Sequence, residues 1–137
     1  MASGCESMEV PASEVARSVC SILIVDDAIG TRAPLGEMLR QRGYRVFEAA
    51  DADQALALLN SRQEIHALIT DVQMPGSMDG IALARWVRKT RPMLRVLVVS
   101  GLDVAAQLAG EGIACFRKPL TSEALLAALP CTTVDTR

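Results

Sequence analysis

The chain has 137 residues, which is enough for one domain with a hydrophobic core but not for two of ordinary size. Hydrophobic residues make up 50% of the sequence and aromatic residues only 3%, so the core has to be aliphatic. The net charge is −2 with acids and bases interspersed, which gives no reason to expect a nucleic-acid or anionic-membrane partner. No apolar run reaches the length of a membrane span or a signal peptide, so we expect a cytoplasmic protein.

The four cysteines of the chain fit no metal site and include no CxxC pair. Cys20 and Cys115 lie in or beside apolar segments, where a cysteine is usually a small buried hydrophobic residue. Reduced thiols in a cytosolic protein are the simplest interpretation.

The amino-terminal residues 1–19 are polar and rich in Ser, and Pro11 interrupts them. We expect a flexible N-terminal arm here, because such a segment has little apolar surface to bury. The patterned part of the chain, residues 20–130, is predicted to form one domain. Residues 131–137 are left as a C-terminal tail, too short for a DNA-binding or enzymatic output domain.

The domain begins with Ser21–Val25, a short run of mostly β-branched apolar residues that suits a strand buried on both faces of a parallel sheet. Asp26 and Asp27 follow this strand directly. Two adjacent carboxylates at a strand end need a cation or a base beside them, and Mg²⁺ is the first candidate because it binds carboxylates together with water and phosphate oxygens. The alternative is that the two acids only cap the next helix.

Four further strands are predicted from short apolar runs, at Arg45–Glu48, His66–Thr70, Arg95–Ser100 and Ala114–Arg117. The predicted helices are one capped by Thr31 and ended by Gly43, one capped by Asp51 or Asp53, then Ile81–Thr90, a short helix around Val104–Leu108, and Ser122–Leu129. Because right-handed crossovers are the rule, this alternation predicts an α/β fold, a doubly wound (βα)5 parallel sheet with helices on both faces.

Polar residues stand at the ends of four of these strands. Asp26 and Asp27 follow the first strand, Asp71 the third and Lys118 the fifth, while Ser100 ends the fourth. Parallel strands bring their carboxyl ends to one edge of the sheet, so these side chains should converge. The set suits phosphoryl transfer to a carboxylate, because Mg²⁺ on the paired acids and the lysine would screen the repulsion between the two anions. The hydroxyl would hydrogen-bond a phosphoryl oxygen.

Residues Ser21 to Leu129 resemble the receiver domain of two-component response regulators. The resemblance is carried by four segments: Val25-Asp26-Asp27, Asp71-Val-Gln-Met-Pro75 followed by Asp79-Gly80, Ser100-Gly101, and Lys118-Pro119. It implies a flavodoxin-like sheet of strand order 2-1-3-4-5. It also implies that Asp71 accepts a phosphoryl group from a histidine kinase or a phosphotransfer protein.

The same resemblance implies a set of metal ligands. Mg²⁺ would be bound by Asp27, Asp71 and the backbone carbonyl of Gln73, with Asp26 acting mainly through water. It further implies a cis peptide bond between Lys118 and Pro119.

In two places the chain departs from the family pattern. The resemblance implies that Ser100 turns toward the phosphoryl group and that an aromatic residue three positions before Lys118 follows it, but this position is Cys115. The adjacent Phe116 should point to the opposite face of its strand and so cannot replace that aromatic. The interval from Ser100 to Lys118 is also short for the family by about one helical turn, so we expect an abbreviated or irregular fourth helix.

The leading hypothesis is a stand-alone, single-domain response regulator, which is a switch and not an enzyme. Phosphorylation of Asp71 with Mg²⁺ would change a protein-binding surface, or the phosphoryl group would be relayed. The alternative is a receiver-like docking module that acts without phosphorylation. A Mg²⁺-dependent phosphohydrolase ranks last, because that chemistry usually has a second acid two residues after the nucleophile and this chain has Gln73 there.

Overall fold

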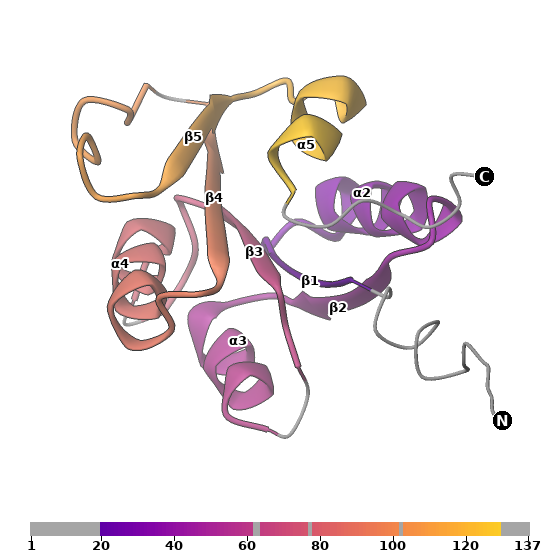
Figure 1. The fold of residues 1–137 in the computed structure, drawn as a ribbon, viewed down its shortest axis with the longest axis horizontal. Helices are drawn as coiled ribbons and strands as arrows, with labels where there is room; N and C mark the ends of the chain where they lie inside the picture. The colour runs from indigo at the N-terminus through magenta and orange to yellow at the C-terminus, as the bar shows by residue number, and fades with distance from the viewer. Residues whose placement is uncertain (1–19, 62–63, 77, 102, 130–137) are drawn as a thin grey trace, which may run out of the picture.

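The computed structural model describes residues 20–61, 64–76, 78–101 and 103–129, and the predicted arm and tail lie outside them. Five parallel strands form one sheet in the order β2-β1-β3-β4-β5 (Figure 1), which confirms the predicted flavodoxin-like order. The strands are β1 (Ser21–Val25), β2 (Arg45–Ala49), β3 (Ala67–Asp71), β4 (Arg95–Ser100) and β5 (Ala114–Arg117).

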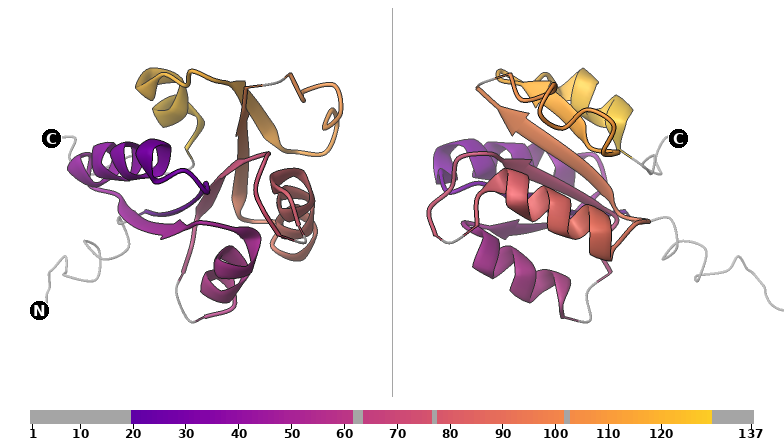
Figure 2. Two further views of the ribbon diagram at one scale, coloured as in Figure 1. Left: turned by 180° about the vertical axis from the view of Figure 1, so that it is seen from behind. Right: turned by 90° about the vertical axis from the view of Figure 1, so that its left-hand side faces the viewer.

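Helices cover both faces of this sheet, as the alternating pattern predicts. Within the described residues they are α2 (Ile29–Gln41), α3 (Ala52–Leu59), α4 (Gly80–Thr90) and α5 (Ser122–Ala128). Figures 1 and 2 show α2 and α5 on one face of the sheet and α3 and α4 on the other.

The core is divided into two aliphatic clusters, one on each face, because successive residues of a strand point to opposite sides. In β4, Val98 packs with the α3 and α4 cluster and Leu97 packs with the α2 and α5 cluster. In β5, Cys115 packs toward the first cluster and Phe116 toward the second. Phe116 therefore lies on the face opposite Cys115, as strand alternation predicts.

Three helices begin at a polar side chain that accepts a hydrogen bond from a backbone N–H three residues later. These caps are Asp51 for α3, Asp79 for α4 and Thr121 for α5, with donor–acceptor distances of 2.9, 2.9 and 3.1 Å. Of the two caps predicted for α3, Asp51 is the one used.

Helix α2 begins earlier than predicted, and Thr31 is not its cap. The N-cap residue is Ala28, whose backbone N–H donates to Asp26 Oδ1 over 2.9 Å. Because the side chain of Asp26 takes this N–H, the helix can start directly after the paired acids. The predicted end is observed, since Gly43 follows the helix with a positive φ of 95° that favours glycine.

Residues 103–113, the β4–β5 connection, contain no helix, so the predicted helix around Val104–Leu108 is wrong. The stretch forms consecutive turns, and Gly110 and Gly112 have positive φ angles of 80° and 74° that interrupt a helical path. Val104 and Leu108, the first and last residues of the predicted helix, are nevertheless buried in the α3 and α4 cluster. The connection is therefore irregular, as its short length predicts, but it is packed.

The prediction of reduced thiols holds at Cys115 and is wrong at Cys20. Cys115 is a free thiol, but Cys20 is disulfide-bonded.

Among the helices of the described residues, none combines the length and the apolar character needed to cross a bilayer.

Truncation of Leu108 tests whether the irregular connection is part of the core. Its side chain is 1% exposed, so Leu108→Ala should lower the free energy of unfolding by about 2–5 kcal/mol. Urea unfolding measures this loss, with Gln107→Ala at an exposed neighbouring position as the control. A Leu108→Ala variant as stable as the unaltered chain would mean that the connection is not packed.

Candidate functional site

The register of the sheet places the polar strand ends next to one another. Asp26 follows the last residue of β1, which pairs with the residue before Asp71. On the other side of β3, Asp71 pairs with the residue before Ser100, and Ser100 pairs with the residue before Lys118. These four residues therefore lie one step apart across the carboxyl edge of the sheet.

Three carboxylates form a cluster at this edge. Asp26, Asp27 and Asp71 each have an oxygen within 4.8 Å of the oxygens of the other two. Asp26 is buried, Asp71 is partly buried and Asp27 is exposed, so the cluster opens to solvent on one side. Oxygen ligands with a high negative charge suit a hard divalent cation, and the residues present fit Mg²⁺.

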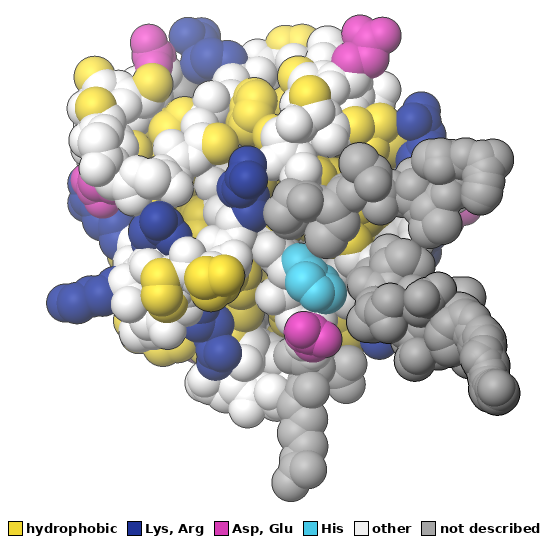
Figure 3. Space-filling view, in the orientation of Figure 1, with side chains coloured by type: hydrophobic (Ala, Val, Ile, Leu, Met, Phe, Trp, Pro, Cys, Tyr) yellow, Lys and Arg dark blue, Asp and Glu magenta, His cyan; other side chains and the backbone are white. Residues whose placement is uncertain are grey.

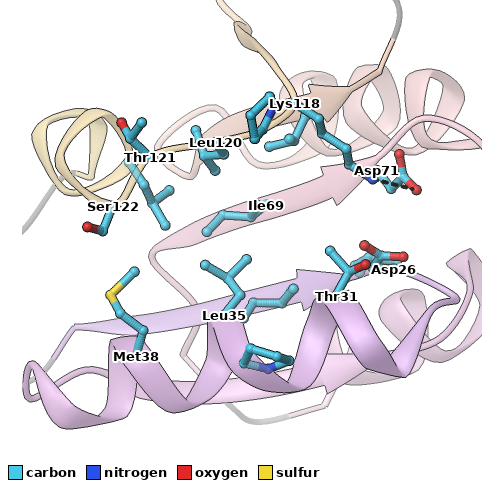
Figure 4. Close-up of a pocket in the computed structure, with 16 residues that line it drawn as sticks. Asp26, Thr31, Leu35, Met38, Ile69, Asp71, Lys118, Leu120, Thr121 and Ser122 are labelled. Atoms are coloured by element: carbon cyan, nitrogen blue, oxygen red, sulfur yellow. Dashed lines mark ion pairs between the residues drawn. The ribbon is translucent and has the colours of Figure 1, made fainter.

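Asp71 is held by contacts at both of its carboxylate oxygens. Oδ1 accepts a hydrogen bond of 2.8 Å from the backbone N–H of Val72, and Oδ2 lies 3.4 Å from Nζ of Lys118 (Figure 4). The first contact fixes the orientation of the carboxylate, and the second places an ammonium group where an anion bound to Asp71 would meet it.

Lys118 reaches Asp71 from the end of β5. Its backbone N–H donates to the carbonyl of Ser100 over 2.8 Å, which extends the β4–β5 pairing by one residue. The peptide bond between Lys118 and Pro119 is cis, as the resemblance implies. Ser100 itself is 2% exposed, so its side chain is enclosed at the sheet edge.

The backbone of Asp71 is in direct contact with Gly80, the first residue of α4. The Gly80 N–H donates to the Val72 carbonyl over 2.8 Å. A Cβ atom at this position would overlap the carbonyl group of Asp71. Only glycine therefore allows α4 to begin so close to the acid. The sequence pattern contains this glycine, but the contact depends on tertiary structure and was not predicted.

Two predicted positions have a weaker connection to the cluster. Gln73 is exposed in the loop after β3, and the place of its carbonyl among the metal ligands stays a prediction. Cys115, at the usual aromatic position, is partly buried, and its Sγ lies 3.8 Å from the Ile113 carbonyl. Burial raises the pKa of this thiol above its ordinary value, and the negative charge of Asp103 raises it further.

A groove next to the cluster was also not predicted. The α2–α5 groove has a volume of about 640 Å³ and lies between α2 and the start of α5. Leu35 and Met38 of α2 line one wall, Leu120 lies opposite them, and Asp71 lies at one end (Figure 4). Leu125 of α5 also lines the groove. The groove is thus an apolar surface that leads to the carboxylate cluster.

A family model described as response regulator receiver domain matches residues 22–130 of the chain. The chain is 34% identical over 79 residues to sporulation initiation phosphotransferase F of Bacillus subtilis (strain 168), an alignment that covers 58% of this chain and 62% of that protein. It is 38% identical over 82 residues to sensor kinase CckA of Brucella abortus (strain 2308), covering 59% of this chain and 9% of that protein. The chain thus spans less than two thirds of either relative.

Similarity to solved structures extends over most of the fold. A response regulator protein from Burkholderia pseudomallei has a TM-score of 0.72 and 29% sequence identity to this chain. The match covers 80% of this chain and 66% of that one. That crystal structure contains a phosphorylated aspartic acid, a calcium ion and citrate.

Substitution of Gly80 tests the contact between α4 and Asp71. In Gly80→Ala the new methyl group should push the two backbones apart, lowering the free energy of unfolding by about 1–3 kcal/mol. The displaced Asp71 should also bind Mg²⁺ more weakly in calorimetric titration. Gly30→Ala is the matched control, because a Cβ atom at that helical position meets nothing within 4 Å. Equal behaviour of the two variants would contradict the prediction.

Proposed function

The chain belongs to the receiver-domain family of response regulators, and from this premise we propose that it is a phosphorylation-dependent switch. Asp71 accepts a phosphoryl group from the phosphohistidine of a histidine kinase or of a phosphotransfer protein. The observation that carries the proposal is the convergence of Asp26, Asp27, Asp71 and Lys118 at one edge of the sheet.

In the proposed reaction, a carboxylate oxygen of Asp71 attacks phosphorus, so that a P–O bond forms as the P–N bond to the donor imidazole breaks. The donor imidazole leaves and takes up a proton. The lysine ammonium, 3.4 Å from Oδ2 of the acid, compensates negative charge on the transferred group. The hydroxyl of Ser100 is proposed to hydrogen-bond a phosphoryl oxygen.

The cation of the proposed site is Mg²⁺. Its ligands are proposed to be Asp27, Asp71 and the Gln73 carbonyl, with Asp26 acting through water. Bound Mg²⁺ would screen the repulsion between the phosphoryl group and the carboxylates. The Burkholderia structure contains both a phosphorylated aspartic acid and a divalent calcium ion, which supports this proposal.

The α2–α5 groove supports a protein as the phosphoryl donor. A phosphohistidine must approach Asp71, and the apolar wall of Leu35 and Met38 leads directly to that residue. We propose that an amphipathic helix of the donor packs its apolar face along this groove.

The basic residues give no support to a nucleic-acid partner. Figure 3 shows Lys and Arg side chains at several separate places on one face of the molecule. Many guanidinium groups also donate to backbone carbonyls of the protein itself, among them those of Arg32, Arg40, Arg85, Arg88, Arg91 and Arg95. Their geometry is thus set by the fold, and the absence of a nucleic-acid partner stays a prediction. Absence of a membrane partner and a cytoplasmic location stay predictions.

We propose that the domain is a switch and not an enzyme. Its phosphorylated form engages a target protein or passes the phosphoryl group on. The stand-alone arrangement stays a prediction, since the alignment with sensor kinase CckA covers only 9% of that protein. The rival function is a docking module without phosphorylation, which the cysteine at position 115 favours because the usual aromatic is missing.

Intact-mass measurement separates the switch from the docking module. Incubation with acetyl phosphate and Mg²⁺ should add one phosphoryl group to the unaltered chain and none to Asp71→Asn, because only a carboxylate can form the acyl phosphate. Asp53→Asn, at an exposed position of α3, is the control and should be labelled normally. No labelling of the unaltered chain, either by acetyl phosphate or by a panel of histidine kinases, would favour the docking module.

A positive charge introduced into the groove tests whether the donor protein docks there, separately from the phosphoryl-transfer reaction at Asp71. Met38→Arg should slow phosphoryl transfer from a kinase that labels the unaltered chain, because the donor helix would meet a buried cation. It should leave labelling by acetyl phosphate unchanged. Gln41→Arg, on an exposed part of the same helix, adds the same charge outside the groove and should affect neither donor. Unchanged transfer from the kinase would contradict docking in the groove, and equal slowing with both donors would mean that the substitution acts on the chemistry and not on docking.

A further inference from the structure

Arg32 lies in an unusual place for a cation. It is close to the amino end of α2, where the helix dipole disfavours positive charge. Its side chain is only 12% exposed, so desolvation adds to this cost. An arginine here must therefore be held by strong local contacts.

Those contacts join Arg32 to the acid loop and to β2. Nη1 donates to the backbone carbonyl of Asp26 over 2.6 Å, and Nε donates to Glu48 Oε1 over 3.0 Å. The planar guanidinium suits this arrangement, because two of its N–H groups point in fixed directions.

Glu48 is fixed in its turn. Its second carboxylate oxygen lies 3.2 Å from Nη1 of Arg40, and Nη2 of Arg40 donates to the Val46 carbonyl in β2. A Cβ atom at Gly36 would lie 3.0 Å from Glu48 Oε2, so the carboxylate lies directly against the α2 backbone. Arg32 is therefore anchored at a carboxylate that has a second ion pair of its own and lies against α2.

The anchored guanidinium of Arg32 also binds the peptide between Asp26 and Asp27, the two acids that follow β1. The Asp26 N–H donates to the Ala49 carbonyl over 3.0 Å, and Asp26 Oδ1 accepts from the Ala28 N–H over 2.9 Å. The contact from Arg32 fixes the remaining backbone group, the carbonyl of the Asp26–Asp27 peptide. The orientation of this peptide determines where the Asp27 carboxylate lies relative to Asp71.

We propose that Arg32 is a positioning residue of the cation site. Through the Asp26 carbonyl it holds the Asp26–Asp27 peptide in the orientation that brings both carboxylates to Asp71. This inference rests on the proposed function, because it concerns the affinity of the same site for Mg²⁺.

A positioning role and a purely electrostatic role predict opposite results. If Arg32 acted only through its charge, its removal would strengthen cation binding, because a positive charge near three carboxylates opposes a second cation. If Arg32 positions the peptide, its removal weakens cation binding. Arg32→Lys keeps the positive charge but cannot bind the Asp26 carbonyl and Glu48 through two N–H groups in fixed directions. It therefore separates the positioning effect from the electrostatic effect.

The test is calorimetric titration of the unphosphorylated chain with Mg²⁺ alone. Arg32→Gln and Arg32→Lys should each weaken binding by about tenfold, the lower end of the effect seen when outer contacts of metal ligands are removed. Arg42→Gln is the control. It removes the same charge from an exposed position at the end of α2 and should bind Mg²⁺ normally. Circular dichroism and thermal unfolding establish that each variant is folded.

The outcomes separate this inference from the proposed function. Normal binding by the unaltered chain and by both Arg32 variants, or tighter binding by Arg32→Gln, would overturn the positioning role only. Absence of Mg²⁺ binding by the unaltered chain would overturn the proposed metal site and this inference with it. If Arg32→Gln does not fold, the comparison between Arg32→Lys and the unaltered chain decides.

Discussion

Three carboxylates within 4.8 Å of one another are the constraint on which the rest of this structure depends. Two unit charges at about 4 Å repel by roughly 1 kcal/mol in water and by about 4 kcal/mol near a protein surface. The parallel register imposes this closeness on Asp26 and Asp71, since their strands end side by side. Backbone N–H groups of Ala28 and Val72 and the ammonium of Lys118 compensate part of the charge. The negative charge of the three carboxylates that these groups do not compensate attracts a cation to the site.

Features encoded in short segments could be predicted from the sequence, and contacts between distant segments could not. The parallel sheet and its polar strand ends follow from local hydrophobic runs and crossover geometry, so Asp71 could be placed correctly at the end of its strand, whereas the strand order was implied by the resemblance to receiver domains. The start of α2 was missed because the helix begins at Ala28, whose backbone N–H donates to Asp26, and it has no side-chain cap at Thr31. The helix predicted near Val104 is replaced by turns, and the two glycines that follow take positive φ angles. The contact between Arg32 and the acid loop requires the packing of α2 on β2, which periodicity does not reveal.

Polar contacts make up for the small size of some helices. Helices α3 and α5 have only 8 and 7 residues, which is too short for stability in isolation. Their last carbonyl groups are bound by arginines from other elements: Arg91 donates to Leu59 at the end of α3, and Arg95 donates to Ala128 at the end of α5. In a core with few aromatic residues, these contacts fix helix ends that aliphatic packing alone would leave loose.

The contact between Gly80 and the backbone of Asp71 has a mechanical consequence. No side chain separates them, so a shift of the Asp71 backbone would act directly on the amino end of α4. Further along α4, Arg85 binds Glu111 of the β4–β5 connection at 3.0 Å. The described residues thus contain a series of direct contacts that leads from the carboxylate cluster through α4 to the β4–β5 connection, and neither Ser100 nor Cys115 is part of it.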